Sequence, residues 1–217
     1  MPDAVIFDLD GVILDSEQLW NQAKEQLVRG AGGTWRDDAP HTMMGMSAPE
    51  WSAYLHDELG VPLDPKAIDR EVGTRMEELY RERLPLLPGA VEAVRALAVQ
   101  WPLGLASSSN REIIDLALQE AGVAEAFAAT VSSEEVERGK PAPDVYLEAA
   151  RRIGVRPATC VAVEDSSNGL RSAAAAEMTV IAVPNPHYPP DADALGLAAV
   201  VLGTLHELTP QLVAGLH

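Results

Sequence analysis

The chain has 217 residues, of which 47% are hydrophobic, and a formal net charge of −17 at pH 7. This length suits one large globular domain, or a domain with a modest second module, and the negative charge argues against nucleic acid or an anionic membrane as partner. No stretch approaches the ~20 apolar residues of a membrane span, and charged residues interrupt the N-terminus where a secretion signal would be apolar, so we expect a cytoplasmic protein.

The first predicted element is a buried strand from the apolar run at residues 4–7, which leads directly into Asp8 and Asp10. Alternate residues of a strand share a face, and Gly11 marks where the strand geometry ends. Two carboxylates this close repel each other unless a cation, a proton or a function offsets the cost. They are the first indication of chemistry in the chain.

The segment from about residue 16 to residue 84 contains no convincing strand. Its apolar residues recur at helical spacing in the stretches 16–32, 48–60 and 65–84, so we predict three or four amphipathic helices inserted after the first strand. Trp20 and Trp51 lie in two of these stretches, and we expect both in the core of the inserted helices rather than in contact with a ligand.

Strand-like runs and helix-like stretches alternate through the rest of the chain. The apolar runs of strand length are residues 102–109, 127–133, 160–166, 180–184 and 198–203. This alternation predicts an α/β fold, a doubly wound parallel sheet with helices on both faces. We predict an α/β core of residues 1–15 and 85–217 and a helical cap of residues 16–84. Cys160, the single cysteine of the chain, is expected to be a small core residue.

Polar residues follow several of the predicted strands, at the edge where open α/β sheets bind ligands. In chain order they are Asp8, Asp10, Ser107, Ser108, Ser109, Lys140, Glu164 and Asp165. Each alone could be a helix cap, a turn residue or a surface charge. Their joint placement predicts a single site.

A cluster of four carboxylates and one lysine needs a cation, and all-oxygen ligands favour Mg²⁺ over zinc. A phosphoryl group could then lie between Mg²⁺, the Lys140 ammonium and the groups at Ser107 and Ser108, which we expect to begin a helix. Such a site predicts phosphoryl transfer, in which one carboxylate forms an acyl phosphate and a second, Asp10, protonates the leaving oxygen and later deprotonates water.

The motifs that carry these residues resemble those of the haloacid dehalogenase (HAD) superfamily. They are FDLDGVILDS at 7–16, LGLASSS at 103–109, GKPAPD at 139–144 and VEDSSNG at 163–169. The likeness covers essentially the whole chain and is strongest to β-phosphoglucomutases and sugar-phosphate phosphatases with a helical cap. It implies a Rossmann-like core and a hydrolase of phosphoric monoesters. The implied partner is a small phosphorylated metabolite, and we expect the protein to be a monomer or a weak dimer.

The resemblance also implies roles for individual residues. Asp8 is the nucleophile, Asp10 the acid/base, and Ser107 and Lys140 hold the transferring phosphoryl group. The Mg²⁺ ligands are oxygens of the acidic motifs, namely the Asp8 and Asp165 carboxylates, the Asp10 backbone carbonyl and, directly or through water, Glu164. Candidate contacts to the rest of the substrate are Ser108 and Asn110 on the core side and Met44, Met46 and Trp51 on the cap side.

We therefore predict a Mg²⁺-dependent phosphatase acting on a small ester, by default a sugar phosphate, through an aspartyl phosphate. Phosphoglycolate is an alternative substrate, and a phosphosugar mutase is an alternative activity. In β-phosphoglucomutase a histidine and a cap arginine occupy the positions that here hold Trp20 and Ala48. Hydrolysis is favoured because neither position provides a cation to bind a second phosphate. The cap cations that could bind it from other positions are Arg36, Lys66, Arg70 and Arg75.

Two binding modules are alternatives from a different class. A phospho-receiver also uses an aspartate, a hydroxyl and a lysine around Mg²⁺, but its phosphorylated aspartate ends the third strand, and residues 127–133 contain none. A degenerate member of the superfamily that only binds is disfavoured because every expected catalytic residue is present.

Overall fold

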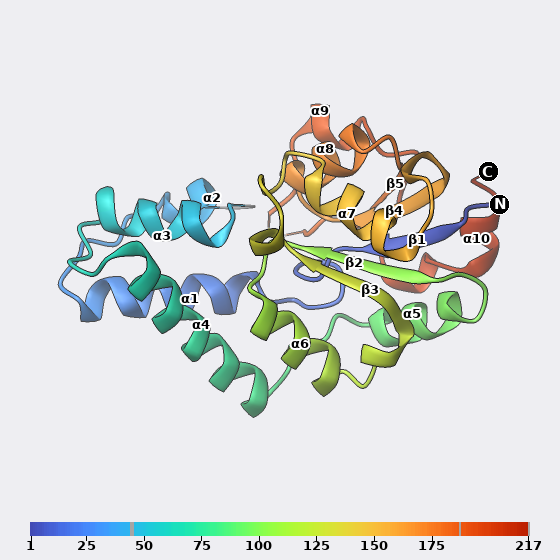
Figure 1. Ribbon diagram of the computed structural model, residues 1–217. Helices are drawn as coiled ribbons and strands as arrows, with labels where there is room; N and C mark the ends of the chain where they lie inside the picture. Colours follow the sequence, from blue (N-terminus) through green and yellow to red (C-terminus); the bar gives the residue numbers. More distant parts are fainter. Residues whose placement is uncertain (44–45, 187, 217) are drawn as a thin grey trace.

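The structure is a computed structural model that describes residues 1–43, 46–186 and 188–216. Figure 1 shows a sheet covered by helices, with a separate group of helices at the end of the molecule opposite the N- and C-termini. The predicted fold class, a parallel α/β sheet with a helical insertion, is confirmed.

Among the described residues, six strands form one parallel sheet in the order β3-β2-β1-β4-β5-β6. They are β1 (Ala4–Phe7), β2 (Leu103–Ser107), β3 (Phe127–Ser132), β4 (Cys160–Glu164), β5 (Thr179–Ala182) and β6 (Val200–Val201). Each overlaps one of the apolar runs predicted to be a strand. Because β1 pairs with β2 on one side and β4 on the other, the polar residues that follow these three strands are neighbours at the carboxyl edge of the sheet.

Different helices cover the two faces of the sheet. Val5 and Phe7 pack into the core that includes α5 (Ala90–Ala98), α6 (Arg111–Glu120) and α10 (Pro210–Ala214). Ala4 and Ile6 pack into the opposite core, with α7 (Asp144–Ile153), α8 (Ser167–Ala175) and α9 (Ala192–Leu195). Successive side chains of a strand point to opposite faces, so a strand covered on both sides must be apolar throughout. Cys160 is fully buried in the second core, as expected.

The described residues of the α/β core also form four short 3₁₀ helices. They are η1 (Ala124–Ala126), η2 (Ser133–Glu135), η3 (Pro157–Thr159) and η4 (Leu205–Glu207). None of the described helices is both long enough and apolar enough to cross a membrane. The cytoplasmic location and the monomeric or weakly dimeric state stay predictions.

The helical insertion consists of α1 (Glu17–Gly30), α2 (Ala39–Met43), α3 (Ala48–Asp57) and α4 (Pro65–Glu82), which we call the cap. Figure 1 shows it beyond the carboxyl edge of the sheet. On α4, the residues Ile68, Val72, Met76 and Tyr80 recur every four residues and are all buried, so this stripe forms the inner face of the helix.

The two connections between core and cap run side by side. The backbone N–H of Asp15 donates to the Pro85 carbonyl (2.8 Å), and the N–H of Leu87 donates to the Ile13 carbonyl (3.0 Å). These bonds lie where the sequence pattern predicts the boundary between cap and core. The exact division of the chain at residues 15/16 and 84/85 stays a prediction.

Candidate active site

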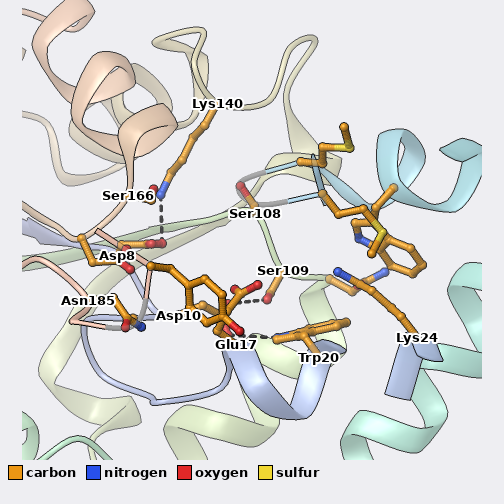
Figure 2. Close-up of a pocket in the computed structure, with 17 residues that line it drawn as sticks. Asp8, Asp10, Glu17, Trp20, Lys24, Ser108, Ser109, Lys140, Ser166 and Asn185 are labelled. Carbon is orange, nitrogen blue, oxygen red and sulfur yellow. Dashed lines mark hydrogen bonds and ion pairs between the residues drawn. The ribbon is translucent and has the colours of Figure 1, made fainter. Parts of the chain in front are cut away.

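A pocket lies between the carboxyl edge of the sheet and the cap (Figure 2). The core side of its lining includes Asp8, Asp10, Ser108, Asn110, Lys140 and Asp165. The cap side includes Glu17, Trp20, Lys24, Met43, Met46 and Trp51. The structure therefore brings the predicted site residues together, except that Ser107 and Glu164 lie behind the pocket surface.

Lys140 lies between two buried carboxylates. Its Nζ is 2.9 Å from Asp8 Oδ1 and 2.5 Å from Glu164 Oε1. Burial and the charge of Glu164 raise the pKa of Asp8 to about 8, although Lys140 opposes this shift. Burial disfavours the charge on Lys140, but the two carboxylates outweigh it and raise the pKa of Lys140, so the ammonium stays charged. Figure 2 shows this ammonium pointing at the Asp8 carboxylate.

Glu164 is fully buried, and both of its carboxylate oxygens already accept hydrogen bonds. Oε1 accepts from Lys140 and from the Tyr146 hydroxyl (2.7 Å). Oε2 accepts from the backbone N–H groups of Asp165 (3.0 Å) and Ser166 (3.3 Å). Glu164 thus positions the Lys140 ammonium and the turn after β4. Of the two metal contacts predicted for it, direct or through water, this arrangement favours the indirect one.

Asp8, Glu164 and Asp165 bring carboxylate oxygens within 4.8 Å of one another. Asp165 Oδ1 is buried, and no residue of the described chain donates a hydrogen bond to it. Burial, Glu164 and Asp8 raise the pKa of Asp165 well above its ordinary value. A buried carboxylate oxygen without a partner is costly beside other acids. The donor set therefore fits a divalent cation of the Mg²⁺ type, held by Asp8 and Asp165.

Gly11 leaves the room that Asp165 occupies. Its φ is +83°, and a Cβ at this position would lie 2.0 Å from Asp165 Oδ2. A side chain here would displace the Asp165 carboxylate, so the glycine that marks the end of the first strand also shapes the acidic cluster.

We expect Gly11→Ala to lower both stability and activity more than Gly32→Ala does. Gly32 has nearly the same φ, +84°, but a Cβ there would meet no atom within 4 Å. Both changes place alanine in the left-handed region, which costs about 1–2 kcal/mol. Urea unfolding should show a further loss for Gly11→Ala, and phosphate release should fall only in this variant. Equal effects of the two changes would contradict the proposed role of the space beside Asp165.

The turn after β2 differs from expectation. The prediction that a helix begins at Ser107 and Ser108 is wrong, because Ser107 still pairs with Ser132 in the sheet and α6 begins only at Arg111. Ser107 is fully buried, and its Oγ accepts the N–H of Ser109 (3.0 Å). The side chain of Ser107 thus supports the turn, whereas Ser108 and Ser109 line the pocket.

The Asp10 carboxylate is held by residues of both cap and core. It accepts hydrogen bonds from the Ser16 hydroxyl, the Trp20 indole N–H (3.1 Å) and the Ser109 hydroxyl (2.6 Å), and a long one from Tyr80 (3.5 Å). Trp20 is buried, as expected for a cap-core residue, but it also contacts the site, which its apolar pattern did not indicate. The orientation of Asp10 thus depends on where the cap lies.

Asn110 lies at the border between core and cap. Its Nδ2 donates to both oxygens of Asp69 on α4 (3.1 and 3.2 Å) and to Glu134 (3.2 Å). Its Oδ1 is buried and accepts no hydrogen bond from the described chain. Asn110 therefore ties α4 to the core and lines the pocket on the core side, where a substrate contact is predicted.

Glu17 and Lys24 are pocket residues that sequence reasoning missed. They lie on α1 with Trp20 between them, three and four residues apart, so all three share one helix face. Burial lowers the pKa of Lys24, against the charges of Glu17 and Asp10. The signal that could have found them is the pair of charged residues on the face that otherwise carries the apolar stripe.

The other cap residues named from the sequence fall into three groups. Met46 and Trp51 line the pocket, and Met44 lies outside the described residues. Ala48 is buried and does not line it. The candidate cations for a second phosphate, none of which lines the pocket, are Arg36, Lys66, Arg70 and Arg75.

Comparison with known proteins agrees with this geometry. A family model described as a haloacid dehalogenase-like hydrolase matches residues 2–177. The chain belongs to this family. Hexitol phosphatase B of Escherichia coli (strain K12) is 37% identical to it in an alignment of 218 positions that covers 98% of this chain and 96% of the relative. The predicted resemblance and the predicted enzyme class, a HAD phosphatase, are thereby confirmed.

Solved structures of the HAD family are also similar. The structure of CbbY from Rhodobacter sphaeroides in complex with phosphate has a TM-score of 0.86 at 28% identity, covering 96% of each chain. A β-phosphoglucomutase from Clostridium difficile has a TM-score of 0.84, covering 99% of this chain and 96% of that one, and at 24% identity it shows the common fold. The capped HAD architecture predicted from the motifs is confirmed.

Proposed function

We propose that the protein is a Mg²⁺-dependent phosphatase that hydrolyses a small phosphate monoester, a sugar or sugar-alcohol phosphate, through a phosphoryl group carried on Asp8. The observation that carries this proposal is the contact of Asp8 with the Lys140 ammonium (2.9 Å) on the floor of a pocket that Asp10 and Asp165 also line. The name of the relative Hexitol phosphatase B supports the substrate class.

In the first step, a carboxylate oxygen of Asp8 attacks phosphorus and the bond from phosphorus to the leaving oxygen breaks. Lys140 holds the nucleophile and offers positive charge to the phosphoryl oxygens. Mg²⁺, when held by Asp8 and Asp165, would supply further positive charge, without which these acids repel an anionic ester. Asp10 donates a proton to the leaving alcohol oxygen.

In the second step, the same Asp10 carboxylate takes a proton from water, and the water oxygen attacks phosphorus. The bond between phosphorus and Asp8 breaks, so inorganic phosphate is released and the carboxylate is restored. The hydrogen bonds that Asp10 accepts from Ser16, Trp20 and Ser109 orient its carboxylate for these proton transfers. Splitting hydrolysis in this way replaces one difficult displacement by two easier ones.

Replacing Asp10 by alanine should slow the first step only for leaving groups that need a proton, and it should slow the second step for every substrate. With a sugar phosphate, kcat/KM should fall about 10²–10⁴-fold, because the alkoxide needs a proton. With p-nitrophenyl phosphate, whose leaving group needs none, rapid mixing should show a burst of one nitrophenol per site followed by slow turnover. A missing burst with normal steady-state rates would contradict the role of Asp10 in the second step.

The pocket favours hydrolysis over a mutase reaction. A mutase must retain a bisphosphate, but the cap cations named from the sequence lie outside the pocket lining. Among the described lining residues, the cap cation is Lys24, which shares the pocket with Glu17. This is little positive charge for a second phosphate dianion. The structural likeness to β-phosphoglucomutase extends to the fold alone.

A panel of phosphate esters with Mg²⁺ present tests the proposal. We expect phosphate release, ranked by kcat/KM, to be greatest for sugar and sugar-alcohol monophosphates, with phosphoglycolate included as the alternative substrate. Glucose 1-phosphate with added glucose 1,6-bisphosphate should yield free glucose. Glucose 6-phosphate as the main product would instead establish a mutase, and a protein that binds these esters without turnover would be a binding module.

A further inference from the structure

Lys24 is a buried cation of the cap that donates no hydrogen bond and forms no ion pair with any residue of the described chain. It is only 6% exposed, and its Nζ lies 5.5 Å from the ring centroid of Trp20 and 4.9 Å from that of Trp51. Figure 2 shows the side chain reaching into the pocket above Trp20, with Nζ toward the site. Contacts with ring faces stabilise a cation only in part, so the ammonium can still donate to a ligand in the pocket.

The core wall of the pocket carries the complementary group, a buried acceptor. Asn110 Oδ1 lacks a hydrogen-bond donor within the described part of the chain. The orientation of this amide is settled by chemistry, because its nitrogen faces the carboxylates of Asp69 and Glu134, which can only accept. The amide oxygen is therefore the atom of this pocket-lining residue that has no partner in the described chain.

Glu17 adds a second acceptor on the cap side. Its carboxylate receives a hydrogen bond from Asn21 Nδ2 (3.3 Å) and lines the same pocket as Lys24. Among these three pocket residues, Lys24 is a donor and Glu17 and Asn110 offer acceptors, and the charges of Lys24 and Glu17 oppose each other. A ligand matched to this set must both donate and accept hydrogen bonds and carry no net charge.

Hydroxyl groups meet this requirement, and a second phosphate or a carboxylate does not. A hydroxyl can accept from Lys24 and donate to Glu17 or to Asn110 Oδ1. A phosphate dianion only accepts, so it would gain from Lys24 and be repelled by Glu17 and by the unpaired amide oxygen.

We propose that Lys24 determines specificity for the leaving group, by donating to a hydroxyl of a neutral polyhydroxylated alcohol while Glu17 and Asn110 Oδ1 accept from others. The inference rests on the proposed phosphatase function and narrows its substrate class to monophosphates of polyols or sugars, as opposed to bisphosphates and phosphorylated acids. Lys24 touches the part of the ester that does not react, so it acts on recognition and not on the chemical step.

The test compares Lys24→Met with wild type on two esters of the same carbon number, sorbitol 6-phosphate and hexyl phosphate. Losing a hydrogen bond from a charged donor should lower kcat/KM for sorbitol 6-phosphate by about 10- to 100-fold. Hexyl phosphate has no hydroxyl for Lys24 to bind, so its kcat/KM should stay within about threefold. Lys66→Met, which removes an exposed lysine of the same cap, should change neither value.

Three results would overturn the inference. Equal losses on both esters would make Lys24 a structural residue, and no loss on either would exclude a contact. A larger loss on fructose 1,6-bisphosphate than on sorbitol 6-phosphate would make it an anion site. Calorimetric binding of the two monophosphates in an Asp8→Asn background keeps the comparison decisive if the protein proves to have no phosphatase activity, because Lys24→Met should still weaken only the sorbitol ester. A preserved melting temperature shows that the variant folds.

Discussion

Replacing Asp8 by asparagine is expected to lower kcat by more than about 10⁴-fold, the size of loss seen when a covalent nucleophile is removed. An amide oxygen is too weak a nucleophile to form the phosphoryl intermediate. The fold should survive, because asparagine has the shape of aspartate and its amide oxygen can still accept a hydrogen bond from the Lys140 ammonium. The change also removes one of three clustered acids, so the unfolding free energy should change by about 1 kcal/mol or less.

Asp3→Asn is the matched control. Asp3 precedes β1 and is exposed, whereas Asp8 follows the same strand and is buried. The Asp3 variant should keep the wild-type rate of phosphate release, with p-nitrophenyl phosphate as a convenient substrate. Acid-quenched wild-type enzyme should carry a phosphoryl group on the peptide that contains Asp8, seen by mass spectrometry. Turnover that persists in Asp8→Asn would overturn the assignment of the nucleophile.

Removal of divalent cations is expected to abolish activity and to make stability depend on pH. Asp8 and Asp165 both have folded-state pKa values above those of an unfolded aspartate, so the folded protein binds more protons across this range. Stability therefore falls as pH rises from about 4 to about 8. In chelator, the melting temperature should drop between pH 5 and pH 8. Lys140, whose pKa is raised, titrates only above this window and does not contribute.

Mg²⁺ should reverse this loss, because it binds the ionised carboxylates of the folded state. At about 100 times its dissociation constant, a ligand adds roughly 2.7 kcal/mol, which for a chain of this size corresponds to about 5–10 °C in melting temperature. The shift should be greater at pH 8 than at pH 5. Differential scanning fluorimetry with and without Mg²⁺ measures it directly.

Variants at two carboxylates separate site binding from a general salt effect. Asp165→Asn removes the oxygen pair that includes the unpartnered Oδ1, so the Mg²⁺-dependent shift should disappear. Asp115→Asn, which changes an exposed carboxylate on α6, should keep the full shift. If Asp165→Asn responded to Mg²⁺ as wild type does, the proposed cation site would be wrong.

Local sequence patterns predicted much of the fold and part of the site. The apolar runs predicted all of the described strands because a strand covered on both faces has no room for polar side chains. Because β1 lies between β2 and β4, residues that follow these strands had to meet at one edge. Asp8 and Asp165 meet for this reason, whereas Lys140, also predicted in the site, follows none of these three strands and lies ahead of α7.

The sequence alone thus determined the architecture and the acidic centre. The architecture follows from the spacing of apolar residues, and the acidic centre from the carboxylates that directly follow the predicted strands. Only the tertiary structure decided which neighbours face the pocket. The Ser107 side chain is buried because its backbone is still paired in the sheet. Trp20 donates a hydrogen bond to Asp10 because α1 packs across the carboxyl edge of the sheet. Lys24 lies in the pocket because of how α1 is rotated about its own axis. Packing against the rest of the cap sets this rotation, and the spacing of residues along one helix does not specify it.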